Sequence, residues 1–244
     1  MRRVAVRVPA ADAEPARAVF VELFPDGFEE REQTDVLELA AYTDGPGEAR
    51  IRKAFGSVRA SKVEPGWEKR WRDFHRPVRI GPLWIGPGWE APPSGSLAVV
   101  IEPARAFGTG AHPTTRSCVE LLVELRPEFA GGASLLDIGC GSGVLAIAAT
   151  RLGYGPVAAV DTEANAIAET RRNARVNGVE IETWVADALR DELPSADVAV
   201  ANIARATIEE VAARLRCHIL VASGYLESDT LKLRGFRQRA RRVA

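Results

Sequence analysis

The residues best suited to chemistry lie in two glycine-rich stretches, AFGTGAHPTTRS (residues 106–117) and LDIGCGSGVLAIAA (residues 136–149). In the second stretch, Asp137 comes just before a turn through Gly139 and Gly141. Glycines permit a tight turn and let a ligand approach the backbone closely, and the helix that follows begins with unpaired N–H groups. In a doubly wound sheet, ligands bind at such strand ends. Two stretches so close in the chain predict one pocket built from both.

The glycine pattern excludes two common phosphate-binding loops. The dinucleotide fingerprint GxGxxG needs glycine or alanine at position 144, where this chain has Val144. A P-loop is excluded because no Gly-Lys-Ser/Thr follows the glycines. The ligand of this turn is therefore not expected to be NAD, FAD or a nucleoside triphosphate.

Acids accompany three successive strand-like runs: Asp137, Asp161 at the end of PVAAVD, and Asp187 in WVADA. An acid at the end of the second strand can accept from both hydroxyls of a ribose, and one after the third strand from an adenine amine. Each acid taken singly is also explained as a cap or turn residue. Together, around a turn with no phosphate-binding feature, they predict a phosphate-free nucleoside, and S-adenosylmethionine is such a cofactor.

The elements that must position these residues follow from hydrophobic periodicity. From residue 97 onward, apolar strand-like runs alternate with amphipathic helical runs, which predicts an α/β fold with a doubly wound, mostly parallel sheet covered on both faces. The expected strands are 97–102, 134–139, 156–161, 182–187, 197–204 and 218–224, and the expected helices are 116–129, 143–153, 163–178 and 206–216.

Two further regions precede this sheet. Residues 1–64 show the order βαββαβ, which predicts a small α+β ferredoxin-like domain. Residues 65–96 are rich in Trp, Pro and Gly and are expected to form a linker. Residues 97–244 are expected to form the domain that binds the nucleoside. The tryptophans are expected to pack between elements rather than to face a substrate.

Bulk composition narrows the class of protein. The chain has 244 residues and a net charge of -1, without the basic footprint of a nucleic-acid binder. Arg7 and Pro9 interrupt any signal-peptide core, and no apolar run has the length of a membrane span. Cys118, Cys140 and Cys217 lack the spacing of a metal site and are expected to be reduced thiols. We therefore expect a cytoplasmic protein with no metal and no nucleic-acid or membrane partner.

In this order, AFGTGAHPTTR, LDIGCGSGVLAIAA, VDTEANAIAETRRNARVNG and VANI resemble the ribosomal protein L11 (L-eleven) methyltransferases, the PrmA family. WEKRWRDFHRPVRIGPLWIGPGWE also resembles the linker of that family, so the likeness covers residues 65–224 closely. The resemblance implies a class I methyltransferase domain that uses S-adenosyl-L-methionine, an N-terminal substrate-recognition domain, ribosomal protein L11 as the substrate, and a monomer.

The resemblance also implies the site residues. The loop matching AFGTGAHPTT would cover the cofactor, Gly139 would meet its methionine moiety and Asp161 its ribose. Asn202 would lie near the transferred methyl group and Phe107 would wall its path, so these two are the expected catalytic residues. Thr115 would contact the cofactor, although threonine at a helix start can also simply cap. The expected cofactor contacts are Phe107, Gly108, Thr109, Gly110, Thr115, Asp137, Gly139, Gly141, Asp161, Asp187 and Asn202.

Two features bear on the substrate. Methyl transfer to an amine depends mainly on orienting a neutral lone pair, so no strong general base is required. His112, which stands before a proline, is expected to be structural rather than a base. Asn202 is followed by Ile203, Ala204 and Arg205, without the Pro-Pro-aromatic run of methyltransferases that act on planar nitrogens. This favours an aliphatic amine, a lysine or an N-terminus, although Arg205 is a mild departure from the family.

A larger departure follows HILVASGYLESD. The family continues into a last strand that pairs antiparallel with its neighbour, and TLKLRGFRQRARRVA is expected not to form it. The arginines there are expected to be a solvated edge rather than an RNA contact; they are Arg234, Arg237, Arg239, Arg241 and Arg242. Two alternatives stay open: a class I methyltransferase of another protein or a small-molecule amine, and a catalytically inactive homologue that still binds the cofactor.

Overall fold

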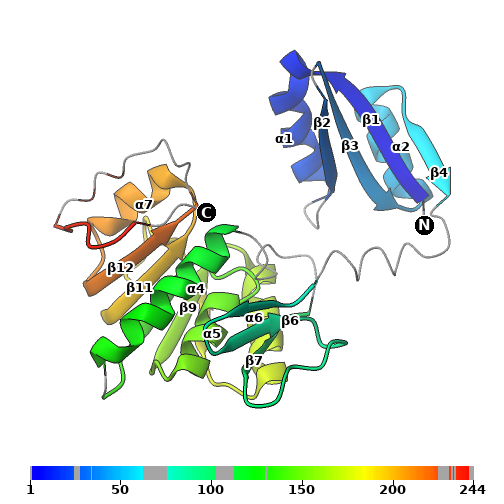
Figure 1. Ribbon diagram of the computed structural model, residues 1–244. Helices are drawn as coiled ribbons and strands as arrows, with labels where there is room; N and C mark the ends of the chain where they lie inside the picture. Colours follow the sequence, from blue (N-terminus) through cyan, green and yellow to red (C-terminus); the bar gives the residue numbers. More distant parts are fainter. Residues whose placement is uncertain are drawn as a thin grey trace. The chain divides into compact units, whose positions relative to one another are not determined.

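The computed structural model describes residues 2–24, 28–33, 35–62, 76–102, 113–129, 131–224, 231, 233 and 235–241. It divides the chain into two compact units, Met1–Phe74 and His75–Ala244 (Figure 1). None of the helices in the described ranges combines the length and the hydropathy that crossing a lipid bilayer requires.

The first unit is a four-stranded antiparallel sheet with two helices on one face. Its elements are β1 (Arg2–Pro9), α1 (Ala13–Leu23), β2 (Glu29–Gln33), β3 (Val36–Thr43), α2 (Gly45–Phe55) and β4 (Arg59–Lys62). The strand order β2-β3-β1-β4 and the βαββαβ sequence confirm the predicted ferredoxin-like fold. Alternate residues such as Val4, Val6, Leu37 and Leu39 pack against Phe20 of α1, as the period of a strand requires.

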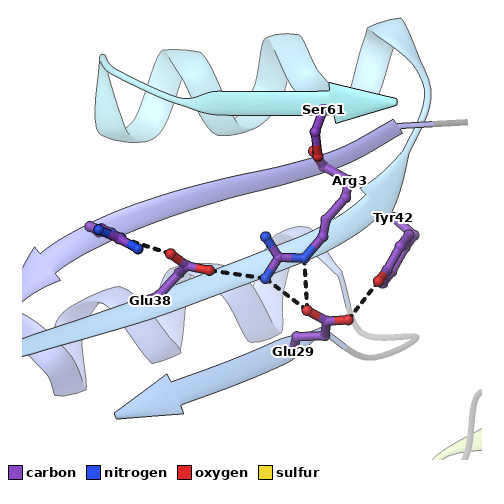
Figure 2. Close-up of polar contacts among 6 residues, drawn as sticks. Arg3, Glu29, Glu38, Tyr42 and Ser61 are labelled. Atoms are coloured by element: carbon purple, nitrogen blue, oxygen red, sulfur yellow. Dashed lines mark hydrogen bonds and ion pairs between the residues drawn. The ribbon is translucent and has the colours of Figure 1, made fainter. Parts of the chain in front are cut away.

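A ladder of charges crosses strands β1, β2 and β3 in this unit (Figure 2). Arg3 donates to Glu29 at 2.8 Å and to Glu38 at 3.0 Å, and Arg7 donates to Glu38 at 2.7 Å. The Tyr42 hydroxyl donates to Glu29 at 2.6 Å. The hydrogen bond from Arg7, opposed by burial and joined by that from Arg3, lowers the pKa of Glu38. The ladder therefore favours the ionised carboxylate and stabilises the sheet most above its ordinary pKa.

The second unit is built on a five-stranded parallel sheet with the order β10-β9-β8-β11-β12. This confirms the predicted doubly wound α/β fold, and the strand order reverses between β8 and β11. Its elements are α4 (Pro113–Leu125), β8 (Leu135–Ile138), α5 (Val144–Leu152), β9 (Val157–Asp161), α6 (Ala164–Asn177), β10 (Glu182–Val185), β11 (Ala196–Asn202), α7 (Arg205–Ala212) and β12 (Cys217–Ser223).

Both faces of this sheet are covered (Figure 1). Leu135 of β8 packs in one apolar cluster with residues of α4, α5 and α6, whereas Leu136 packs in a second cluster with Ile208 and Val211 of α7. Neighbouring residues of a strand point to opposite faces, so a strand covered on both faces is apolar throughout. The continuous apolar runs in the sequence have this cause.

Part of the range expected to be a linker forms strands. Within 76–96, β5 (Val78–Ile80) pairs antiparallel with β6 (Leu83–Gly86), which pairs in parallel with β7 (Leu97–Val100). These strands belong to the second unit, and Trp84 is buried in β6. Strands of three and four residues bounded by Pro and Gly carry too little periodicity to be recognised in sequence.

Candidate functional site

The reversal of strand order brings three predicted site residues together. In the sheet, Ile138 of β8 pairs with Ala201 of β11 and with Val160 of β9. The next residues along these parallel strands are Gly139, Asn202 and Asp161, so they meet at the carboxyl edge of the sheet. Ligands of doubly wound folds bind at this edge, beside the point where the strand order reverses.

The glycine turn after β8 requires glycine for conformation and for space. Gly139 has φ 75° and Gly143 has φ 80°, a region that residues with a side chain rarely adopt. A Cβ on Gly139 would lie 2.4 Å from Cγ2 of Ile203, and one on Gly143 would lie 2.8 Å from the side chain of Thr170. The turn therefore packs tightly against the residue after Asn202 on one side and against α6 on the other.

Asp161 fixes this turn through its carboxylate. Its Oδ2 accepts from the backbone N–H of Gly141 at 3.0 Å, and its Oδ1 accepts from that of Glu163 at 3.0 Å. A carboxylate has about four acceptor positions, so these two bonds leave each oxygen with a further lone pair. Asp161 thus combines a fixed orientation with free capacity to accept from the two hydroxyls of a ribose.

Asp137 is fully buried beneath the start of α5. Its Oδ2 accepts from the N–H of Ala146 at 3.1 Å, which caps a helix whose N-cap residue, Gly143, has no side chain. Its Oδ1 has no hydrogen-bond partner among the described residues. Desolvation, opposed by the bond from Ala146 and reinforced by the charge of Asp161, raises its pKa to about 7. Asp137 therefore holds the start of α5.

Asn202 and Thr115 lie in contact although 87 positions separate them. The carboxamide Nδ2 of Asn202 donates to the Thr115 hydroxyl at 3.3 Å, and Thr115 is almost fully buried inside α4. Because this bond uses the NH₂ group, it leaves the Oδ1 of Asn202 to accept from another donor. The structure thus offers an oriented hydrogen-bond acceptor at the end of β11.

Asp187 is placed differently from the other predicted acids. It lies two residues beyond β10, which is separated from β8 by β9. Its Oδ1 accepts from the N–H of Leu189 at 2.9 Å, and its Oδ2 lies 3.4 Å from Arg190. These contacts all belong to its own turn. Of the remaining predicted residues, Phe107, Gly108, Thr109, Gly110 and His112 lie outside the described residues.

Sequence reasoning missed a set of buried polar residues on α6. Thr170, Asn173 and Asn177 are all buried, and their spacing places them on one face of the helix. Asn177 bonds both backbone groups of Val100 in β7, at 2.7 and 2.8 Å. The sequence does contain a sign of these residues, because they occupy positions where an amphipathic helix normally carries its apolar stripe.

Two cavities lie elsewhere in the second unit. One of about 620 Å³ is lined by the amino ends of β8, β9, β10 and β11, opposite the edge that carries Asn202. Another, of about 530 Å³, lies between α4, β12 and residues 235–241, where Arg239 pairs with Glu128 at 3.0 Å. Neither is the site defined by the glycine turn, so cavity size alone does not identify it.

The described residues around the glycine turn fit S-adenosylmethionine. Asp161 has acceptor capacity for ribose hydroxyls, and Asn202 offers an amide acceptor. Carboxylates at strand ends suit a nucleoside that carries no phosphates, since phosphate-binding sites supply N–H groups and cations instead. Parallel strand order, glycine turn and strand-end acid together define the class I methyltransferase fold.

Comparison with known proteins places the chain within this class. The family model "Ribosomal protein L11 methyltransferase (PrmA)" matches residues 23–230, so the chain belongs to that family. A ribosomal protein L11 methyltransferase of Aeromonas hydrophila subsp. hydrophila is 38% identical over 217 residues, which cover 82% of this chain and 73% of the relative. One of Yersinia pestis is 39% identical over 184 residues, 74% of this chain and 61% of the relative.

A solved structure is similar to part of this chain. The ribosomal protein L11 methylase of Lactobacillus delbrueckii subsp. bulgaricus superposes with a TM-score of 0.55 and 29% sequence identity, over 62% of this chain and 80% of that chain. The matched part of the chain spans about 61% of the length of the Yersinia relatives.

Proposed function

We propose that this chain transfers methyl groups from S-adenosylmethionine to amines of ribosomal protein L11, on lysine side chains and/or at the N-terminus. Membership of the family and the names of its relatives support the substrate. The observation that carries the proposal is the Asn202 carboxamide, oriented by Thr115 at the edge where Gly139 and Asp161 meet. With this substrate, the reaction takes place in the cytoplasm.

Several residues of the second unit would hold the cofactor. Asp161 accepts from the ribose hydroxyls, the backbone at Gly139 meets the methionine moiety, and Asp187 accepts from the adenine amine. Asp137 sets the start of α5 and thereby the turn. We further propose that the ferredoxin-like unit recognises the protein substrate.

The chemistry needs an oriented neutral amine. The bound cofactor supplies an electrophilic methyl group on a sulfonium, whose departure leaves a neutral thioether. A lysine amine with its ordinary pKa of ~10.4 is mostly protonated at neutral pH, so it must lose a proton to solvent before it reacts. The Oδ1 of Asn202 accepts an amine N–H and aims the lone pair at the methyl group.

A carboxamide suits this task better than a carboxylate. An anionic side chain would stabilise the unreactive ammonium form of the amine. Asn202 is neutral, so it orients the amine without that effect. The lone pair that Asn202 orients would accept the methyl group supplied by the bound cofactor, and the methylated ammonium product would then release one proton to solvent. No strong base among the chain's residues is needed for either proton.

The test uses the full chain with labelled S-adenosylmethionine and purified large-subunit ribosomal proteins. Label on L11 supports the proposal, and mass spectrometry of the labelled protein then assigns the amines. Asn202→Ala should lower kcat about 10- to 100-fold, the cost of one buried polar contact. Asn165→Ala, an exposed change on α6, should leave the rate unchanged. Label on another protein, or cofactor binding without transfer, would contradict the proposed activity.

A further inference from the structure

One face of α6 carries polar side chains where apolar ones are usual. Thr170 and Asn173 are 0% exposed and Asn177 is 5% exposed. Burying a polar group costs free energy unless a hydrogen bond compensates for the lost water. The partners of these side chains therefore show what the helix gains from them.

Two of the three hold consecutive carbonyl groups of the glycine turn. The Asn173 carboxamide donates to the carbonyl oxygen of Ser142 at 2.8 Å. The Thr170 hydroxyl lies 3.0 Å from the carbonyl oxygen of Gly141 and 3.3 Å from Sγ of Cys140. These bonds join the turn to a helix that begins more than twenty positions further along the chain.

The glycine turn is costly to order, so these hydrogen bonds matter for its conformation. Gly139, Gly141 and Gly143 all have positive φ, and glycine loses more conformational freedom on ordering than any other residue. Asp161 already holds the N–H of Gly141 from one side. The α6 side chains hold the carbonyls from the other side, so the turn is restrained through both kinds of backbone group.

We propose that Thr170 and Asn173 are positioning residues for the cofactor: by fixing the carbonyls of Gly141 and Ser142, they preorganise the turn that receives S-adenosylmethionine. This inference rests on the proposed function. Both residues act through the turn and are not catalytic.

A positioning role has a distinct kinetic signature. Without these bonds the turn samples more conformations, and binding must supply the cost of ordering it. The dissociation constant and the KM for the cofactor should rise, whereas kcat at saturating cofactor should change little because the bound geometry is the same. A purely structural role would instead lower the melting temperature and leave the affinity of the folded protein unchanged.

Calorimetric titration of the full chain with S-adenosylhomocysteine tests this, at a temperature where circular dichroism shows each variant fully folded. Asn173→Ala and Thr170→Val should each weaken binding roughly tenfold, the effect of one buried hydrogen bond. Thr170→Ser keeps the hydroxyl and should restore most of the affinity. Asn165→Ala lies exposed on the same helix and serves as the matched control.

The outcomes separate this inference from the proposed function. If the wild-type chain binds S-adenosylhomocysteine and both loss variants bind it equally well, the positioning role is wrong and the proposed function stands. If the wild-type chain does not bind the nucleoside, both fail together. Should Asn173→Ala not fold, the comparison of Thr170→Val with Thr170→Ser decides the matter.

Discussion

Replacement of Asp137 by asparagine should change how the stability of the second unit depends on pH. Desolvation raises the pKa of this carboxyl from 3.8 to about 7 in the folded chain. The hydrogen bond from the Ala146 N–H opposes this rise, and the charge of Asp161 adds to it. Asparagine has nearly the same shape, can accept from Ala146 and does not titrate. The difference in stability between wild type and Asp137→Asn therefore reports how protonation of Asp137 affects folding.

The sign and the size follow from linkage. Between the unfolded and the folded pKa, the folded chain keeps a proton that the unfolded chain has released, so stability falls as pH rises and then levels off above the folded value. One pKa unit corresponds to about 1.4 kcal/mol. Between pH 5 and 8, the wild type should lose on the order of 3 kcal/mol relative to Asp137→Asn.

Native-state hydrogen exchange, followed by mass spectrometry on peptides that cover β8 and β11, measures the opening free energy of this unit. Wild type and variant are compared at the same pH without cofactor, so that intrinsic exchange rates cancel. Glu180→Gln removes an exposed acid and should show no such trend. A difference between Asp137→Asn and wild type that stays constant from pH 5 to 8 would refute the argument.

Two further changes test other contacts. Asn177→Ala removes both hydrogen bonds to the backbone of Val100 and should lower the opening free energy of the second unit by about 1–3 kcal/mol, measured on the same peptides; an unchanged value would show that β7 does not depend on them. Glu38→Gln removes a carboxylate whose pKa is lowered by its arginine partners. As pH falls below 4.5, the wild-type first unit should lose stability faster than this variant. Hydrogen exchange of peptides from β1 and β3 measures this, and parallel curves of stability against pH for the two proteins would contradict the prediction.

The site was partly predictable from local sequence. Gly139 and Asp161 stand at the ends of buried apolar runs, and parallel strands bring such ends to one edge, so their proximity follows from periodicity and turn chemistry. The contact between Asn202 and Thr115 is different, because it depends on how α4 packs beside β11. No local pattern reports a hydrogen bond across 87 positions.

Which polar residues are buried could not be predicted from the sequence. The sequence placed Asp137 beside a glycine turn, but only the packed helix shows that Asp137 is fully buried and caps α5. Likewise, the sequence of α6 shows polar residues on its inner face, but only the structure shows that two of them bond the glycine turn. Hydrophobic patterns tell which side of an element is buried and do not tell which groups face that side.

By itself, the sequence determined the two folds, the glycine turn and the position of Asp161 at the end of β9, because the periods of strands and helices and the freedom of glycine are local properties. The tertiary structure decided which polar groups meet: Asn202 with Thr115, and α6 with the turn. Such pairings arise from strand order and helix packing, which join residues far apart in the chain and leave no periodic trace in it.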